Sequence, residues 1–135
     1  MPAGATSLSV LGPATNAIGT GITYAETSID ATNGNKFDND GDTELVVRNT
    51  TAGAIVLDFY ADTPDGNEVK VASRSVPGSG TGHGTVVLGP FKPERFNNHN
   101  TTEVASSGKV IMKPASGITG DLVVCAIKKN KSLRS

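Results

Sequence analysis

The sequence contains little cysteine and few aromatic residues. Among its 135 residues there is one cysteine, Cys125, and no tryptophan. An intrachain disulfide is therefore impossible, which excludes the small secreted scaffolds that several disulfides hold together. The scarcity of aromatic rings argues against a nucleic-acid partner, because single-stranded nucleic acids stack their bases on such rings. A flat platform for a sugar stays possible but would have to come from six residues: Tyr24, Phe37, Phe59, Tyr60, Phe91 and Phe96.

The sequence also lacks long apolar runs. None approaches the roughly 18 residues that a membrane-spanning helix needs. The first residues, MPAGATSLSVLG, carry no basic n-region of the kind that opens a signal peptide. We therefore expect a soluble protein that is made in a cytoplasm and has no membrane partner.

Helix-forming residues are sparse, and turn-forming residues are abundant. The chain has 16 glycines and 7 prolines, and Gly, Pro, Thr and Asn all rank low in helix propensity. Short apolar or alternating segments separated by turns predict strands. We expect an all-β fold, a small β-sandwich or jelly-roll-like domain over residues 21–129. The predicted strands cover residues 21–27, 43–49, 54–61, 68–76, 85–91, 109–114 and 121–129.

Two of these segments carry finer predictions. The tight link from residue 49 to residue 54 predicts that the strands on either side of it form a hairpin. Within 54–61, the side chains of Ile55, Leu57 and Phe59 should share one face, because side chains alternate along a strand.

The two ends of the sequence differ from this domain. Residues 1–20 mix Ala, Gly, Thr, Pro and Ser with scattered apolar residues, which predicts an extended N-terminal arm. Such an arm either does nothing or becomes ordered on a partner. Residues 130–135 form a basic C-terminal tail whose charges are typical of a solvated segment.

The stretch DNDGD at 38–42 suggests either a calcium loop or a turn. With Gly41 at the sixth position of a helix–loop–helix calcium loop, Lys36 falls where the first ligand belongs. Val47 falls at the twelfth position, where a glutamate should close the site. A looser calcium site made from Asp38, Asp40 and Asp42 stays possible. A tight turn before a strand fits the residues better, because Asn, Asp and Gly favour such turns.

No other pattern in the sequence indicates catalysis or a metal centre. The two histidines, His83 and His99, have no cysteine or histidine at metal-ligand spacing. Cys125 lies in an apolar segment and is expected to be a small buried side chain. The glycine-rich GSGTGHG lacks the Gly-Lys-Ser/Thr ending of a phosphate loop, and no Gly-x-Ser-x-Gly elbow occurs. We expect neither an enzyme nor a bound cofactor or metal.

Charge is distributed unevenly along the chain. Residues 1–68 hold ten acids and two bases, whereas residues 69–135 hold three acids and ten bases, for an overall net charge of −1. Either strands from the two halves interleave and neutralise each other's charge, or the surface has an acidic and a basic region through which copies of the chain dock together.

Three stretches together resemble the head decoration, or cement, proteins of tailed bacteriophages. They are F-D-N-D-G-D-T-E-L-V-V-R-N at 37–49, V-L-G-P-F-K-P-E-R-F-N at 87–97, and a closing G-D-L-V-V-C-A-I. The shared pattern is F-x-N-D-G-x-T-x-L-x-V-x-N, then a strand, then an L-G-P-F corner that leads to a short aromatic and asparagine segment. The arm and the basic tail have no counterpart in this pattern.

This resemblance implies a virion structural protein on the capsid surface. Its partner would be the major capsid protein, and such proteins often act as homotrimers that clamp neighbouring capsid subunits. An extended arm could add a strand to an exposed capsid sheet. The apolar anchors for such an arm would be Leu8, Leu11, Ile18 and Ile22. Two alternatives stay open: a tail- or fibre-associated β-module that binds a host surface glycan, and an unrelated β-protein, including an enzyme.

Overall fold

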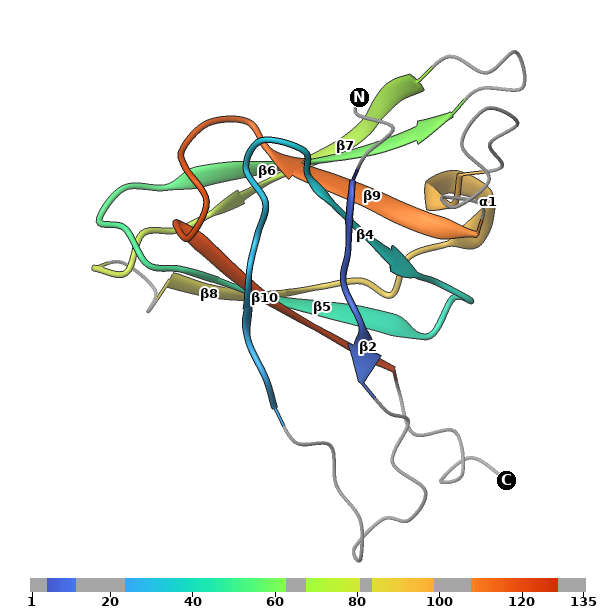
Figure 1. Ribbon diagram of the computed structural model, residues 1–135, viewed down its shortest axis with the longest axis horizontal. Coiled ribbons are helices and arrows are strands. Elements are labelled where there is room, and N and C mark those ends of the chain that lie inside the picture. Colours follow the sequence, from blue (N-terminus) through green and yellow to red (C-terminus); the bar gives the residue numbers. More distant parts are fainter. Residues whose placement is uncertain (1–4, 12–23, 63–67, 81–83, 99–107, 129–135) are drawn as a thin grey trace, which may run out of the picture.

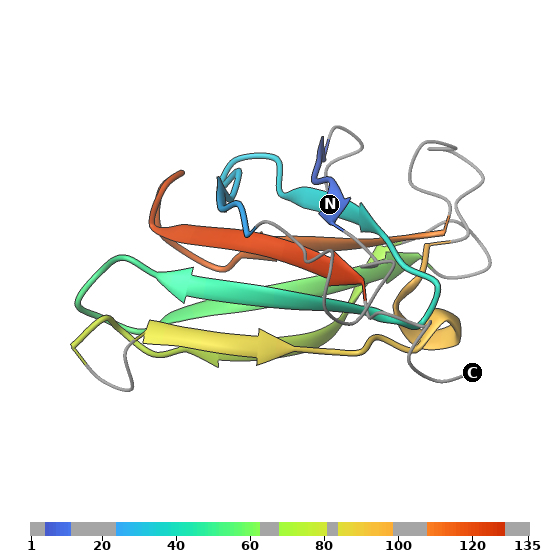
Figure 2. The same ribbon diagram turned by 90° about the horizontal axis from the view of Figure 1, so that it is seen from below.

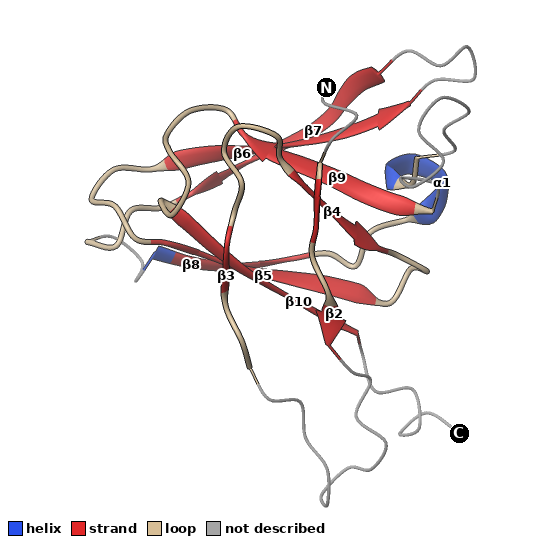
Figure 3. Ribbon diagram, in the orientation of Figure 1, coloured by secondary structure: helices blue, strands red, loops and turns tan. Residues whose placement is uncertain are grey.

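The computed structural model shows an all-β protein, as the sequence predicts. It describes residues 5–11, 24–62, 68–80, 84–98 and 108–128. Nearly all of the regular structure in these ranges is strand, and the one labelled helix, α1, spans only Pro93–Phe96 (Figure 3). The strands form two sheets, here called the first and the second sheet.

The first sheet has five strands, and their order in the sheet differs from their order in the sequence. Its order is β1-β4-β9-β6-β7, with β1 parallel to β4 and the other pairs antiparallel (Figure 1). β6 and β7 are the longest pair, and their register shifts between Phe59 and Tyr60. The bounds are Thr6–Ser7 for β1, Asn35–Asp38 for β4, Lys109–Pro114 for β9, Ile55–Asp62 for β6 and Glu68–Val76 for β7.

The second sheet has the order β2-β10-β5-β8, and β3 also pairs with β10. β2 lies parallel to β10, whereas β5 lies antiparallel to both of its neighbours, β10 and β8. β5 and β8 run side by side in one layer (Figure 2). The bounds are Val10–Leu11 for β2, Leu122–Lys128 for β10, Thr43–Asn49 for β5, Thr85–Leu88 for β8 and Thr27–Ser28 for β3.

The inner faces of the two sheets meet in one hydrophobic core. In β5 the alternate residues Leu45 and Val47 are buried, and in β10 Leu122 and Val124 are buried. The first sheet contributes the predicted face of β6, on which Ile55, Leu57 and Phe59 are all buried, together with Phe37, Val110 and Met112. Burying these side chains, at about 1.5–3 kcal/mol each, is what holds the two sheets together.

The predicted hairpin across residues 49–54 is wrong. β5 ends at Asn49 and lies in the second sheet, whereas β6 begins at Ile55 and lies in the first sheet. The Asn49 side chain fixes the crossing: its oxygen accepts from the Thr51 amide (2.8 Å), and its amide donates to the carbonyls of Gly53 (2.8 Å) and Val76 (3.2 Å). These bonds satisfy the backbone of a connection that leaves one layer and enters the other, so no strand ladder is needed there.

Residues 5–11 lie inside the domain, although the sequence places them in the separate arm 1–20. Thr6 and Ser7 pair with β4 of the first sheet, and Val10 and Leu11 pair with β10 of the second. In Figure 1 this dark blue segment crosses from one sheet to the other along one side of the molecule. It therefore joins the two sheets on that side. Residues 12–20 and the tail 130–135 lie outside the described residues.

Candidate functional site

Of the four predicted partner-binding residues, the structure describes two, and these differ in burial. Leu8 is 7% exposed and belongs to the hydrophobic core, so it anchors the chain's own fold rather than a partner. Its amide also donates to the Lys36 carbonyl (2.8 Å). Leu11 is half-buried and pairs with Ile127. Ile18 and Ile22 lie outside the described residues and stay candidates for the partner contact.

The DNDGD stretch forms a tight turn between β4 and β5. Asn39 Oδ1 accepts from the Gly41 amide (3.1 Å), and Asp40 Oδ1 accepts from the Asp42 amide (3.2 Å). Gly41 has φ +99°, a left-handed conformation that favours glycine. The preference of the sequence for a turn at this position is confirmed.

Two of the aspartates at this turn pair with lysines from neighbouring strands. The Lys109 ammonium contacts Asp38, and the Lys128 ammonium contacts Asp40. Asp38, Asp40 and Lys128 border a hollow of about 300 Å³. Among the described residues, no three His, Cys, Asp or Glu side chains lie close enough to hold a metal ion.

The two longer stretches of the decoration-protein pattern meet in one corner of the fold. The Asn39 side-chain amide donates to the Phe91 carbonyl (3.0 Å) and to Asn97 Oδ1 (2.7 Å). The Asn97 side-chain amide returns a hydrogen bond to the Asn39 carbonyl (2.7 Å). Asn39 is almost fully buried, so each of these bonds replaces water that the amide has lost. We call this set of contacts the asparagine corner.

Aromatic rings pack beside the asparagine corner. The Phe91 ring has centroids of three other rings within 5.6 Å: Phe96 at 5.3 Å, Phe59 at 5.4 Å and Phe37 at 5.5 Å. Most of these contacts are edge-to-face, the arrangement that aromatic quadrupoles favour. The backbone reaches Phe91 through a cis Gly89–Pro90 bond. The L-G-P-F motif thus delivers one ring into the core between the two sheets.

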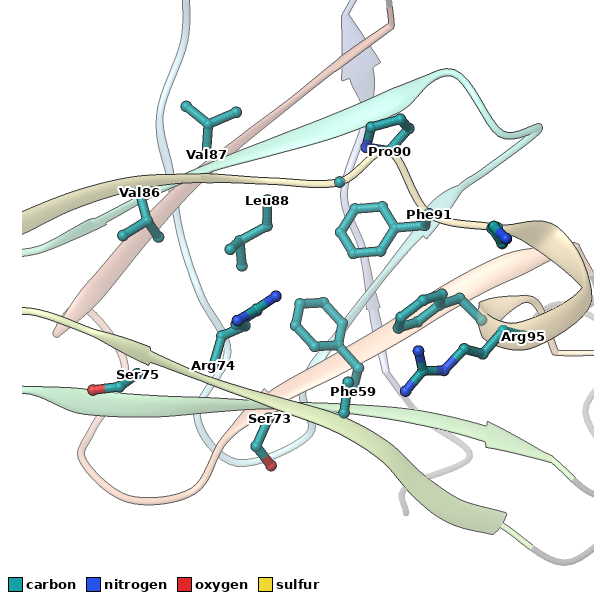
Figure 4. Close-up of a pocket in the computed structure, with 14 residues that line it drawn as sticks. Phe59, Ser73, Arg74, Ser75, Val86, Val87, Leu88, Pro90, Phe91 and Arg95 are labelled. Carbon is teal, nitrogen blue, oxygen red and sulfur yellow. The ribbon is translucent and has the colours of Figure 1, made fainter.

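The side of the molecule bounded by β7 and β8 contains an open groove. β7 is the last strand of the first sheet and β8 is the last strand of the second. Between them lies a space of about 850 Å³, and Figure 4 shows Val86 and Leu88 of β8 pointing into it. Phe59, Phe91 and the half-buried Phe96 line its inner part.

The rim of this groove is basic. Arg74 on β7, Lys92 before α1 and Arg95 in α1 all border the space, and all three are exposed. The described residues that line the groove include no carboxylate. The Arg95 guanidinium lies 5.2 Å from the Phe96 ring centroid and donates to the Val71 carbonyl (2.9 Å), which holds it at the groove mouth. Nothing local in the sequence indicated this site, because its residues come from three separate segments: β6, β7 and the stretch from β8 through α1.

A polar cluster lies on the outer face of the second sheet. Arg48 donates two hydrogen bonds to Glu26, both 2.8 Å long, and these lower the pKa of the Glu26 carboxyl. Tyr24 donates to the same carboxylate (3.0 Å), and partial burial together with this bond raises the pKa of its hydroxyl. Cys125, on the neighbouring strand β10, is 1% exposed, as expected for a small buried side chain. All three polar groups of the cluster are satisfied by one another.

Comparison with protein-family models, with curated proteins and with solved structures gave no match. In the part of the chain that the structure describes, no helix is long and apolar enough to cross a membrane.

Proposed function

We propose that this protein is a virion structural protein that binds the outer surface of a phage capsid and clamps neighbouring major capsid subunits. One observation carries the proposal. The stretches 37–49 and 87–97, which resemble head decoration proteins, are 38 residues or more apart in sequence yet form a single hydrogen-bonded corner through Asn39, Phe91 and Asn97. The resemblance therefore rests on residues that specify one local structure, and not on two unrelated turns.

The architecture suits a clamp. A clamp needs a rigid body, and here the two sheets share one core that includes four packed aromatic rings. It also needs surfaces that can bond to another chain. Edge strands such as β7 and β8 offer main-chain groups for this purpose. A protein that binds only the expanded shell stabilises that shell by mass action, without any chemical step.

Sedimentation with capsids tests this function. Purified chain is mixed with expanded capsids of its cognate major capsid protein and, in parallel, with unexpanded capsids. We expect the chain to sediment with the expanded shells in a saturable ratio and to raise their melting temperature. Binding to neither shell would overturn the proposal, and specific hits on a glycan array in the same preparation would favour the host-glycan alternative.

The homotrimer belongs to the same proposal and has its own test. Light scattering of the purified chain and of the capsid-bound chain gives the mass of the assembling unit. We expect three copies of the 13.8-kDa chain in that unit. A unit that stays monomeric in solution and occupies isolated positions on the shell would contradict the trimer while leaving the capsid role intact.

A further inference from the structure

The two sides of the molecule are closed to different extents. On one side, residues 5–11 add β1 to the first sheet and β2 to the second, and Leu8 places its side chain in the core between them. On the opposite side, the last strands β7 and β8 have the groove of about 850 Å³ between them. The chain thus contains an example of an extended segment that fits between the edges of its own two sheets.

We propose that the groove between β7 and β8 receives an extended acidic segment of the major capsid partner, which lies along the open side as residues 5–11 lie along the closed one. The identity of the partner rests on the proposed function. The segment would bond to a strand edge through its backbone and insert an apolar side chain toward Phe96 and Leu88. Its neighbouring carboxylates would face the basic rim.

Charge identifies this occupant. Arg74, Lys92 and Arg95 surround the groove, and no carboxylate among its described lining residues neutralises them. Four other basic side chains of the described region differ in this respect: Lys70, Lys109 and Lys128 each pair with an aspartate, and Arg48 pairs with Glu26. A groove with an unneutralised basic rim favours an acidic segment over a neutral or basic one.

The chain's own ends do not have this chemistry. The N-terminal 23 residues contain no acid, and residues 129–135 are basic. Neither of these two stretches offers the carboxylates that the basic rim calls for, and we therefore assign the segment to a different protein.

Charge reversal tests the rim. Arg74→Glu combined with Lys92→Glu changes two exposed side chains for which the structure shows no packing role in the core, so the fold should persist. We expect this variant to bind expanded capsids at least tenfold more weakly at 50 mM salt. The control Lys131→Glu plus Arg134→Glu makes the same change in net charge within the C-terminal tail and should bind as the unmodified chain does. Equal affinity of the two variants would overturn the groove assignment while leaving the capsid role standing.

Photocrosslinking tests the position. Cys125 is buried, so a thiol-reactive benzophenone should label an introduced cysteine selectively. Val86→Cys places the probe on β8, where the side chain points into the groove (Figure 4), and Ser116→Cys places it on the exposed loop between β9 and β10 as a control. We expect the position at residue 86 alone to crosslink to a capsid segment rich in Asp or Glu. Crosslinks from residue 86 to a second copy of this chain, or from neither position in capsid-bound samples, would contradict the proposal.

A peptide probe keeps the test independent of the capsid. Backbone NMR of the isolated chain is recorded with a nine-residue peptide of alternating valine and aspartate, and with its valine–lysine counterpart. We expect shifts confined to β7, β8 and α1 with the aspartate peptide only. If the chain binds no capsid, the proposed function fails; if the aspartate peptide at 1 mM also causes no shifts, the groove assignment fails with it.

Discussion

Asn39 has a larger structural role than the acidic residues around it. In the sequence it stands in DNDGD, where the aspartates draw attention as possible metal ligands. In the structure its side chain is buried and makes three hydrogen bonds, two as donor and one as acceptor. The neighbouring Asp40 is exposed and pairs with Lys128 on the surface. The sequence indicated the turn correctly, but not that its asparagine reaches across to residues 91 and 97.

Substitutions within this turn should distinguish the buried hydrogen bonds of Asn39 from the surface ion pair of Asp40. Asn39→Asp keeps the size but replaces both donors with an acceptor and buries a charge. We expect a loss of about 2–4 kcal/mol in the free energy of unfolding, measured by urea denaturation. Asp40→Asn, one residue away, removes the charge of the surface pair with Lys128 and should cost less than about 1 kcal/mol. Similar losses for the two variants would show that the asparagine corner does not hold the fold.

Asp30 links the N-terminal segment to the turn before β4, and its charge should matter for stability. The Asn33 amide and the Thr6 hydroxyl (2.8 Å) donate to its carboxylate, and these bonds lower its pKa. Because the Asp30 pKa is lowered in the folded state, the ionised carboxylate stabilises the fold at neutral pH. This stabilisation is lost as the pH falls below the ordinary carboxyl pKa and through the lowered pKa of the folded state.

Carboxyl NMR titration measures this effect directly. We expect the Asp30 pKa to lie below its ordinary value in the unmodified chain and to rise in Thr6→Val, which removes the hydroxyl donor. The stability difference between the unmodified chain and Asp30→Asn should shrink as the pH falls from 7 to 3. An Asp30 pKa that is the same in Thr6→Val would contradict the contact between β1 and this turn.

Among the elements, the sequence predicted most of the long strands but not their pairing. The predicted strand 21–27 is wrong over residues 24–26, which form no strand, and β1, β2 and β4 were not predicted. β5, β7 and β9 begin and end where the apolar segments 43–49, 68–76 and 109–114 do. Their boundaries are set locally, by turn residues on either side of an apolar run. The partner of a strand is set by residues far away in the chain. This is why the 49–54 link looked like a hairpin although it joins the two sheets.

The N-terminal segment shows the same limit. Residues 5–11 are too short and too mixed in polarity to predict as strands, with Leu8, Val10 and Leu11 as their only large apolar side chains. Their ordering depends on the edges of β4 and β10, which come from distant parts of the sequence. The groove could not be found for the same reason, because its basic rim joins β7 to the region of α1 only after folding.

Leu8 and the isoleucines of the predicted arm should therefore respond differently to substitution. Leu8→Ala removes a core side chain and should lower the free energy of unfolding by about 2–4 kcal/mol in thermal or urea denaturation. Ile18→Ser combined with Ile22→Ser should weaken capsid binding, because these are the remaining apolar anchors of the predicted arm. If the double variant binds expanded capsids as tightly as the unmodified chain, the arm has no part in the interface.

The glycine-rich loop after β7 packs against the crossing between β5 and β6. A Cβ built at Gly78 would lie 2.0 Å from the Ala52 carbonyl oxygen, whereas a Cβ at Gly80 has nothing within 4 Å. Gly78→Ala must therefore displace backbone, and we expect it to cost about 1–3 kcal/mol in unfolding free energy. Gly80→Ala should change stability by less than about 0.5 kcal/mol. Equal stability of the two variants would contradict the packing of this loop.

Across the whole molecule, folding brings some bases of the second half of the sequence onto acids of the first half. Lys70, Lys109 and Lys128 from the basic half pair with Asp58, Asp38 and Asp40 from the acidic half. The expectation that strands of the two halves neutralise each other therefore holds for these pairs. Arg74, Lys92 and Arg95 of the basic half instead border the groove, and we assign this side of the molecule to the capsid.

A density map of intact phage particles shows directly whether this protein binds the capsid. We expect density for this two-sheet domain on the outer surface of the expanded head, between neighbouring capsid subunits, with the β7–β8 side against the shell. Particles that carry this chain only on the tail or fibres, or that contain none of it, would contradict the claim.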